Sequence, residues 1–205
     1  MNISLANIGK RFNTEWIFRN INFEFDAGSQ YAITGPNGTG KSTLLQLIAG
    51  FVQPNEGSIT YKNEKGHIAT ENTYKEVSLA APYLELIEEM TLMEFLIFHR
   101  QMRGLSDGIS IPEIANHVSL GKALHKQIRY YSSGMKQRAK LAQAFFCNAS
   151  VLLLDEPLTN LDSEGVATYY HLIEKFTANR LVIVSSNDER EYSFCTQKID
   201  LLNYK

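Results

Sequence analysis

The sequence predicts an α/β protein built on a parallel sheet, with a helical segment inserted in its middle. Short apolar runs with strand character alternate with longer stretches of helical periodicity, which is typical of parallel α/β folds. Between residues 92 and 128 this alternation stops and the pattern is mostly helical. A chain of 205 residues is long enough for one compact domain that buries about 70% of its unfolded surface.

The N-terminal part of the chain is rich in predicted strands. Residues 3–8 and 16–28 carry apolar side chains at alternating positions, which predicts two strands closed by an Asp-Ala-Gly turn. Residues 29–35 predict a buried strand and residues 40–52 a helix. A Pro-Asn-Glu-Gly turn then leads to a predicted strand at residues 58–61.

The second half of the chain contains the helical insertion and returns to alternation after it. Pro112 suits the first turn of a helix, where its missing N–H is not needed. The expected elements are helices at residues 91–102, 112–120, 135–146 and about 164–178, and strands at 151–155, 181–186 and 198–203.

Composition excludes several classes of protein. A hydrophobic content of 44% and a charged content of 20% are ordinary for a globular protein. A formal net charge of −2 with scattered basic residues gives no reason to expect a nucleic-acid partner. The purely apolar runs are far shorter than the roughly 20 residues of a membrane span, and the first residues lack the apolar stretch of a signal peptide. Cys147 and Cys195 are expected to be reduced thiols, so the chain is expected in the cytoplasm.

Residues 35–43, GPNGTGKST, have the spacing of a phosphate-binding loop between a strand and a helix. Glycines let the backbone curl so that its N–H groups surround a phosphate, and Lys41 adds a positive charge over the β- and γ-phosphate oxygens. The hydroxyl of Ser42 is a candidate ligand for Mg²⁺. The residues expected to bind the nucleotide here are Gly35, Asn37, Gly38, Thr39, Gly40, Lys41, Ser42 and Thr43.

Residues 151–157, VLLLDEP, complement this loop. A buried strand that ends in Asp155 is expected to bring this carboxylate to the sheet edge beside the loop, where it holds Mg²⁺ through water. Glu156 follows and is expected to polarise the water that attacks the γ-phosphate. A GTPase is disfavoured because no N-K-x-D element follows the loop.

Residues 130–138, YYSSGMKQR, indicate a second anion site at the start of a helix. Ser132 and Ser133 offer hydroxyl and backbone donors, and Gly134 lets the chain approach a phosphate closely. An ordinary N-capped core helix is the alternative. Periodicity predicts that this helix buries Met135, Ala139, Ala142 and Phe145 or Phe146, and that Lys136, Gln137, Arg138, Lys140 and Gln143 face elsewhere.

The motifs together resemble the nucleotide-binding subunit of ATP-binding cassette (ABC) transporters, over almost the whole chain. GPNGTGKSTLL is similar to that family's P-loop, and residues 132–162 run through its signature, Walker B strand and D-loop without a break. The resemblance implies a P-loop NTPase (RecA-like) parallel-sheet core with an N-terminal antiparallel β subdomain and an inserted helical subdomain. It implies one domain, with the core at about 1–87 and 131–205 and the helical subdomain at about 88–130.

The resemblance also implies partners and an activity. Two cassettes, a second copy of this chain or a related one, are expected to dimerise head to tail with ATP and Mg²⁺ between the P-loop of one and the signature of the other. Ser132, Ser133, Gly134 and the D-loop residue Asp162 then serve the partner's ATP. Phe12 matches the aromatic residue that stacks on adenine, with a core position as the alternative. A separate transmembrane permease is expected to bind the helical subdomain at the cytoplasmic face of the membrane, so that ATP hydrolysis drives transport. The GMKQR form and the end of the chain at Lys205 favour an exporter-like system.

Three departures from the family pattern bear on the rate. No Gln occurs between Gln53 and Gln101, and Pro82 aligns with the usual Gln position. Asn187 stands where the family has a switch histidine, with an ordinary turn residue as the alternative. In the signature, Tyr131, Ser133 and Met135 replace Leu, Gly and Gln.

The departures predict slow hydrolysis that depends on Glu156. The alternatives are a nucleotide-dependent dimerisation module with little turnover and a non-transport cassette ATPase. The apolar segment AAPYLELI is expected either to contact the membrane subunit or to pack in the core.

Overall fold

The computed structural model describes residues 1–106 and 108–205 and divides the chain into two compact units. The first unit comprises Met1–Leu79, Ala149–Glu156 and Asn179–Lys205. The second comprises Ala80–Asn148 and Pro157–Ala178. The second unit therefore includes helices that the sequence-based division had assigned to the nucleotide-binding core.

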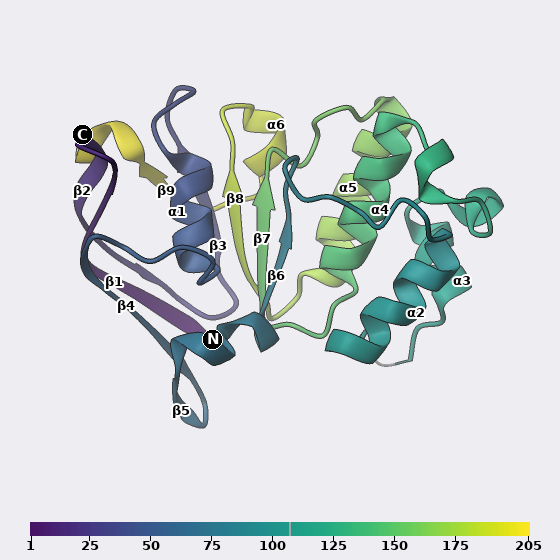
Figure 1. The fold of residues 1–205 in the computed structure, drawn as a ribbon, viewed down its shortest axis with the longest axis horizontal. Helices are drawn as coiled ribbons and strands as arrows, with labels where there is room; N and C mark the ends of the chain where they lie inside the picture. The colour runs from purple at the N-terminus through teal and green to yellow at the C-terminus, as the bar shows by residue number, and fades with distance from the viewer. Residues whose placement is uncertain (107) are drawn as a thin grey trace. The chain divides into compact units, whose positions relative to one another are not determined.

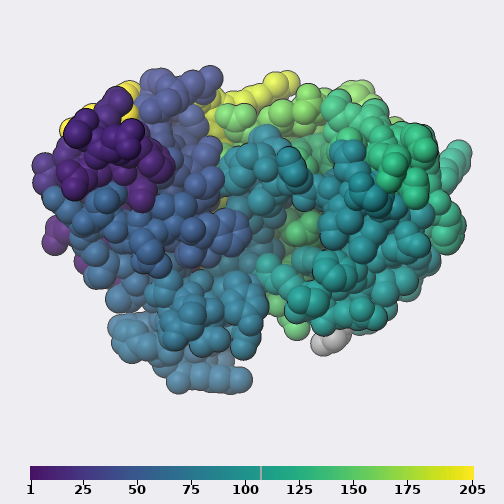
Figure 2. All heavy atoms as spheres, in the orientation of Figure 1, coloured from purple at the N-terminus to yellow at the C-terminus, as the bar shows by residue number. Residues whose placement is uncertain are grey.

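A four-stranded antiparallel sheet in the order β2-β1-β4-β5 forms one layer of the first unit. β1 (Asn2–Phe12) pairs with β2 (Glu15–Phe25) and with β4 (Glu56–Asn63), and β4 continues into β5 (Gly66–Ile68), whose hairpin projects from the sheet (Figure 1, Figure 2). β1 extends beyond the predicted residues 3–8. Its register shifts several times, and Asn7 has a positive φ of 51°. These irregularities interrupt the alternation of apolar residues that defines a strand in the sequence.

A five-stranded sheet in the order β6-β7-β8-β3-β9 forms the core of the first unit. The pairs β7–β8, β8–β3 and β3–β9 are parallel, which confirms the predicted parallel α/β core. The carboxyl ends of these strands lie at one edge of the sheet, and the predicted phosphate-binding loop follows one of them (Figure 1). The strands are β3 (Gln30–Thr34), β6 (Val77–Ala80), β7 (Val151–Asp155), β8 (Leu181–Ser185) and β9 (Gln197–Asp200).

Helix α1 (Lys41–Ile48) ends earlier than the apolar pattern predicts. Gly50 adopts a left-handed conformation with φ of 78°, and its N–H donates to the carbonyl of Leu47 at 3.0 Å. The N–H of Phe51 donates to the carbonyl of Gln46 at 2.9 Å. This pair of hydrogen bonds is a Schellman motif, which terminates the helix although apolar residues continue.

The predicted last strand is also shorter than expected. β9 ends at Asp200, and Leu201–Tyr204 form a 3₁₀ helix instead. The side chain of Asp200 accepts a hydrogen bond from the N–H of Leu202 at 3.0 Å, so the chain turns at this residue. The short helix α6 (Glu189–Tyr192) lies between β8 and β9.

The second unit is helical. Its first two helices begin with capping boxes, formed by Thr91 with Glu94 and by Ser110 with Glu113, so both helix starts follow from local sequence. In the part of the chain that the structure describes, no helix is long and apolar enough to span a membrane. The helices are α2 (Leu92–Arg103), α3 (Ile111–His117), α4 (Ser133–Phe145) and α5 (Ser163–Phe176).

Candidate nucleotide-binding site

The loop between β3 and α1 turns on glycines with positive φ. Gly35, Gly38 and Gly40 have φ values of 137°, 81° and 98°. At Gly40 a side chain would also have no room, because its Cβ would lie 2.3 Å from Cγ2 of Ile17. Glycine is therefore required at these positions by backbone conformation, and at Gly40 by packing as well.

A cavity of about 330 Å³ opens against this loop. Six of the residues predicted to bind a nucleotide line it, together with Glu156, the predicted general base. Ile17 of β2 also lines the cavity and was not anticipated, because in the sequence it is one of several alternating apolar residues of a strand. The lining consists of Ile17, Asn37, Gly38, Gly40, Lys41, Ser42, Thr43 and Glu156.

Lys41 is buried with its ammonium turned into the loop. Nζ donates to the carbonyl of Gly35 at 2.8 Å and to that of Pro36 at 3.3 Å. Burial lowers the pKa of Lys41, and the negative charges of Glu156 and Asp155 act in the opposite direction. The loop thus holds a cation among backbone carbonyls, a position from which it can turn to a phosphate.

Thr39 uses its donors within the loop. Its hydroxyl donates to the carbonyl of Pro36 at 2.8 Å, and its N–H donates to the same oxygen at 3.2 Å. A Cβ on Gly35 would lie 2.9 Å from this hydroxyl. Unlike Ser42 and Thr43, Thr39 does not line the cavity, so its visible role is to close the loop.

Asp155 is the buried acid of the site, with 2% of its surface exposed. Its Oδ1 accepts a hydrogen bond from Oγ of Ser185 at 2.7 Å, and the side chain of Ser42 also bonds to its carboxylate. Burial raises the pKa of Asp155, while both hydroxyl groups and the charge of Lys41 lower it. A cation beside this carboxylate would stabilise its charged form.

The donor chemistry fits a magnesium ion. Ser42 and Asp155 supply hard oxygen ligands from two elements, as Mg²⁺ prefers. Over residues 1–106 and 108–205 no group of three or more His, Cys, Asp or Glu side chains could hold a metal on its own. A metal at this position would therefore take its other ligands from phosphate and water, which is the usual arrangement for Mg²⁺ in phosphate sites.

Glu156 is exposed on the cavity side of β7 and has an unusual backbone. Its φ is 43°, in the left-handed region that costs a non-glycine residue about 1–3 kcal/mol. Its N–H donates to the carbonyl of Ser185 at 2.9 Å, which holds the turn in place. This turn directs the chain out of the strand and leaves the carboxylate at the cavity.

Asn187 lies next to the phosphate-binding loop. Its Nδ2 donates to Oδ1 of Asn37 at 2.8 Å, and both residues are exposed. The bond uses one of the two N–H groups of the Asn187 amide and leaves the other free to donate. Ser185 and Ser186, which precede it, are buried.

Phe12 is at the end of β1 and is 51% exposed. The ammonium of Lys10 lies 5.3 Å from the centre of its ring. The ring is therefore not a core residue, which was the alternative to adenine stacking. It does not line the cavity of the glycine loop.

The second predicted anion site lies at the start of α4. Ser132 is the N-cap residue, and its hydroxyl accepts a hydrogen bond from the N–H of Met135 at 3.2 Å. Ser132 and Ser133 are both exposed. A Cβ on Gly134 would lie 2.9 Å from the carbonyl oxygen of Asn160. Glycine is thus also required here by packing within the second unit, which the sequence motif did not reveal.

The faces of α4 differ from the predicted ones. Gln137, expected to face away from the core, is 3% exposed, and its Nε2 donates to the carbonyl of Pro157 at 2.9 Å. Leu141 and Ala144 are buried as well, so the helix is covered on more than one side. Tyr131, just before the helix, is buried, and its hydroxyl donates to the carbonyl of Ala123 at 2.8 Å. Burial raises the pKa of Tyr131 to about 12.

Asp162, the predicted D-loop residue, is the N-cap of α5. Its Oδ1 accepts a hydrogen bond from the N–H of Gly165 at 2.8 Å, and its side chain is exposed. The residue therefore has a structural task in the isolated chain. Asn160, two residues earlier, has a positive φ of 63°, so this segment is a tight turn between β7 and α5.

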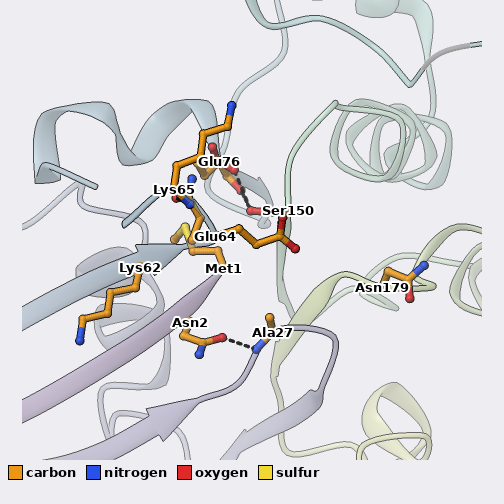
Figure 3. A pocket seen from close by; sticks show the side chains of 10 residues that line it. Met1, Asn2, Ala27, Lys62, Glu64, Lys65, Glu76, Ser150 and Asn179 are labelled. Atoms are coloured by element: carbon orange, nitrogen blue, oxygen red, sulfur yellow. Dashed lines mark hydrogen bonds between the residues drawn. The ribbon is translucent and has the colours of Figure 1, made fainter. Parts of the chain in front are cut away.

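A cavity of about 620 Å³ elsewhere in the first unit is larger than the one at the loop. Figure 3 shows that its hydrogen bonds join protein groups to each other: Asn2 accepts from the N–H of Ala27, and Ser150 donates to Glu76, each at 2.8 Å. It contains none of the predicted site residues. Size alone therefore does not identify the nucleotide site. The side chains around this cavity are those of Met1, Asn2, Ala27, Lys62, Asn63, Glu64, Lys65, Glu76, Ser150 and Asn179.

Known proteins and a family model are similar to this chain in sequence. Residues 18–159 match the family model described as ABC transporter. The chain is 30% identical over 201 residues to the uncharacterized ABC transporter ATP-binding protein YybJ of Bacillus subtilis (strain 168), covering 97% of this chain and 92% of that protein. It is 28% identical to the lantibiotic transport ATP-binding protein SrtF of Streptococcus pyogenes, covering 90% and 79% of the two chains.

A solved structure supports the fold. The dimeric post-hydrolysis state of the ATP-binding cassette MJ0796, bound to ADP and Pi, superposes with a TM-score of 0.80 at 24% identity, covering 97% of this chain and 93% of that one. This likeness confirms the predicted architecture of a parallel core sheet with an antiparallel β subdomain.

Proposed function

The chain belongs to the ABC transporter family, and we propose that it is the ATP-hydrolysing subunit of a membrane transporter that acts as a head-to-tail dimer. One observation carries the proposal: Lys41, Ser42 and Glu156, which come from segments far apart in the sequence, line one cavity at the glycine loop. That set combines phosphate binding with a carboxylate able to act on water.

Each residue of the cavity has a separate task in this proposal. The loop N–H groups and Lys41 bind the phosphates of ATP, and Glu156 accepts the proton of the water that attacks the γ-phosphate. Ser42 and Asp155 would hold Mg²⁺. When bound, the ion offsets negative charge on the phosphate oxygens. The exposed ring of Phe12 stacks on the adenine.

We expect hydrolysis to be slow. The Asn187 amide donates a hydrogen bond but does not become cationic, so it stabilises developing charge less than a histidine does. No Gln occurs between Gln53 and Gln101. Loss of one preorganised donor typically costs roughly 10²–10³ in rate. The retained Glu156 keeps the rate above zero.

The second anion site belongs, in this proposal, to the ATP of the partner cassette, a second copy of this chain or a related one. The exposed serines Ser132 and Ser133 still have hydroxyl protons to donate, and they stand at the positive end of α4. Asp162 lies in the turn that meets the partner near its nucleotide. The similar cassette solved as a dimer with ADP and Pi supports this arrangement.

The partner in the membrane is a separate permease, so the proposed location is the cytoplasmic face of the membrane. Relatives named as transport ATP-binding proteins support this role. The second unit exposes apolar side chains that a permease would cover, in the loop after β6 and on α2. These exposed side chains are Tyr83, Ile87, Ile97, Phe98 and Met102. The GMKQR form of the signature favours an exporter-like system.

Replacement of Glu156 by Gln tests the proposal. The wild-type chain with ATP and Mg²⁺ is expected to release phosphate more slowly than about 1 per second, and Glu156→Gln to release none. The variant should instead accumulate as an ATP-dependent dimer in light scattering, because ATP stays intact between the subunits. Glu174→Gln, an exposed carboxylate on α5, is the matched control and should behave like wild type.

Two results would overturn parts of this function. Wild-type turnover of several per second would contradict slow hydrolysis, and a monomeric Glu156→Gln chain in saturating ATP would contradict the sandwich. The missing Gln and histidine favour a second candidate, a dimerisation module with little turnover. In that case the wild-type chain dimerises with ATP but releases no phosphate.

A further inference from the structure

Lys140 of α4 holds the backbone of the loop that follows β6. Its Nζ donates to the carbonyl of Pro82 at 2.7 Å and to that of Ala81 at 3.3 Å, all within the second unit. The side chain is half-buried. Burial and the neighbouring charge of Lys136 lower the pKa of Lys140, whereas Glu85 raises it. The ammonium is therefore partly desolvated and directed at two carbonyl oxygens, and both hydrogen bonds are charge-assisted.

The same loop is tied to the signature segment at its other end. The N–H of Ile128 donates to the carbonyl of Met90, and the N–H of Arg129 to that of Glu88, both at 2.9 Å. Lys136, one helical turn before Lys140, forms an ion pair with the carboxylate of Glu88. Residues on both sides of Ser132–Gly134 thus hold the loop, from the chain that leads into α4 and from α4 itself.

Pro82 gives the lysine a specific task. This residue aligns with the Gln position that the family resemblance implies, and it has no N–H to donate. The loop is hydrogen-bonded to α4 through the carbonyl oxygens of Ala81 and Pro82. Lys140 donates to both of them. An apolar residue at position 140 would remove both hydrogen bonds. The surface ion pair of Lys136 and Glu88 would not replace them, because such pairs contribute little to stability.

We propose that Lys140 is a positioning residue for ATP hydrolysis, which fixes Ala81 and Pro82 to the helix that carries Ser132–Gly134, so that the loop and the signature respond to nucleotide as one piece. This inference rests on the proposed function for its effect on turnover. Lys140 donates to the carbonyls of Ala81 and Pro82, so it acts through the loop backbone.

Three variants of the full chain test the role of Lys140. Lys140→Met keeps most of the side chain's length and removes the donor, Lys140→Arg keeps charge and donors, and Lys175→Met removes an exposed lysine of α5 as control. We expect Lys140→Met to lower kcat by roughly tenfold with KM for ATP unchanged within about twofold, because the phosphate-binding loop is intact. Lys140→Arg should recover at least about half of the lost kcat, and Lys175→Met should match wild type.

Hydrogen exchange separates this inference from the proposed function. In the Glu156→Gln chain with Lys140 intact, ATP binding should slow exchange in peptides covering residues 81–90 and 133–145 together. When Lys140→Met is added to that chain, the helix peptide should still respond, while the loop peptide should not. This readout needs no turnover, so it remains decisive if the chain does not hydrolyse ATP.

Specific outcomes overturn the inference. They are an unchanged kcat and unchanged loop exchange in Lys140→Met, a Lys140→Arg variant as slow as Lys140→Met, or an equal loss in Lys175→Met. If Lys140→Met has no cooperative thermal transition, Lys140→Ala replaces it and the same two readouts apply. Lys136→Met should lower kcat by less than about twofold, and a loss equal to that of Lys140→Met would also refute a specific role.

Discussion

At the scale of single residues, the two adjacent carboxylates that end β7 show how backbone geometry separates two chemical roles. Asp155 remains in the strand, buried and hydrogen-bonded to Ser185, with its pKa raised by burial. Glu156 turns out of the strand through a positive φ and stands exposed at the cavity. One carboxylate is thus suited to a buried cation and the other to a water molecule, although they are neighbours in the chain.

Replacement of Asn187 is a test at the same scale. We expect Asn187→His to raise kcat by roughly tenfold and to add an inflection near pH 6.5 to the rate profile, because an imidazole can become cationic beside the γ-phosphate. Asn187→Ala should lower kcat further, since it removes the amide donor of this residue. Steady-state phosphate release between pH 5.5 and 8.5 measures both effects, and equal kcat in all three chains would exclude Asn187 from the reaction.

At the scale of elements, the sequence pattern predicted which helices and strands exist better than it predicted where they end or which helix faces are buried. The parallel core strands and the helices after capping boxes were predictable because burial and capping leave local signals. The end of α1 was not, because a left-handed Gly50 overrides apolar residues that continue past it. Gln137 was misplaced because its partner, the carbonyl of Pro157, lies in a distant segment.

The candidate site likewise contains residues that the sequence predicts and residues that it does not. The glycine loop, Asp155 and Glu156 carry motifs that a single sequence reveals. Ile17 and Ser185 carry none, since a strand residue joins the site only when the sheets are formed. The steric need for glycine at position 134 likewise appears only with the carbonyl of Asn160 in place.

Helix α2 carries a prediction about pH and stability. His99 is 7% exposed and stacks on Phe95 with ring centres 6.4 Å apart, and among the described residues none bonds its Nε2. Burial, with a smaller contribution from Arg103, lowers the pKa of His99 from 6.5 to about 4. The unfolded chain therefore takes up a proton that the folded chain resists, so stability is full above pH 6.5 and falls as the pH drops towards 4.

Urea unfolding tests this helix. Between pH 7.5 and 4.5 the wild type should lose about 2–3 kcal/mol more unfolding free energy than His99→Leu, in which the titrating group is absent. His125→Leu removes an exposed histidine and should keep the wild-type pH dependence. If His99→Leu and wild type lose equal stability on acidification, His99 is not neutral and buried as described.

At the scale of the whole molecule, the two predicted phosphate-binding sites belong to different units. The glycine loop with Lys41 belongs to the first unit, and the exposed serines at the start of α4 belong to the second. A single ATP needs only one such loop. A head-to-tail dimer gives each site a use, because two copies then form two composite sites related by a two-fold axis.

Complementation between two inactive chains tests this assembly. Lys41→Met removes the cation of the glycine loop, and Ser133→Glu puts a negative charge where the partner's phosphate would bind. The second change favours α4 itself, since an acidic residue suits a helix N-terminus, so loss of activity there would not reflect unfolding. Each variant alone should be inactive. Mixed in equal amounts, they should recover about a quarter of wild-type turnover, because half of the random dimers are mixed and each has one intact composite site.

A chain that carries both changes is the control for the mixing experiment. Combined with either single variant, it leaves no composite site with both an intact glycine loop and an intact signature, and turnover should stay at background. Recovery in the first mixture and none in the controls is the pattern that only a shared site produces. If the first mixture also stays inactive although light scattering detects ATP-dependent mixed dimers, each chain must complete its own site, and the signature serines need another role.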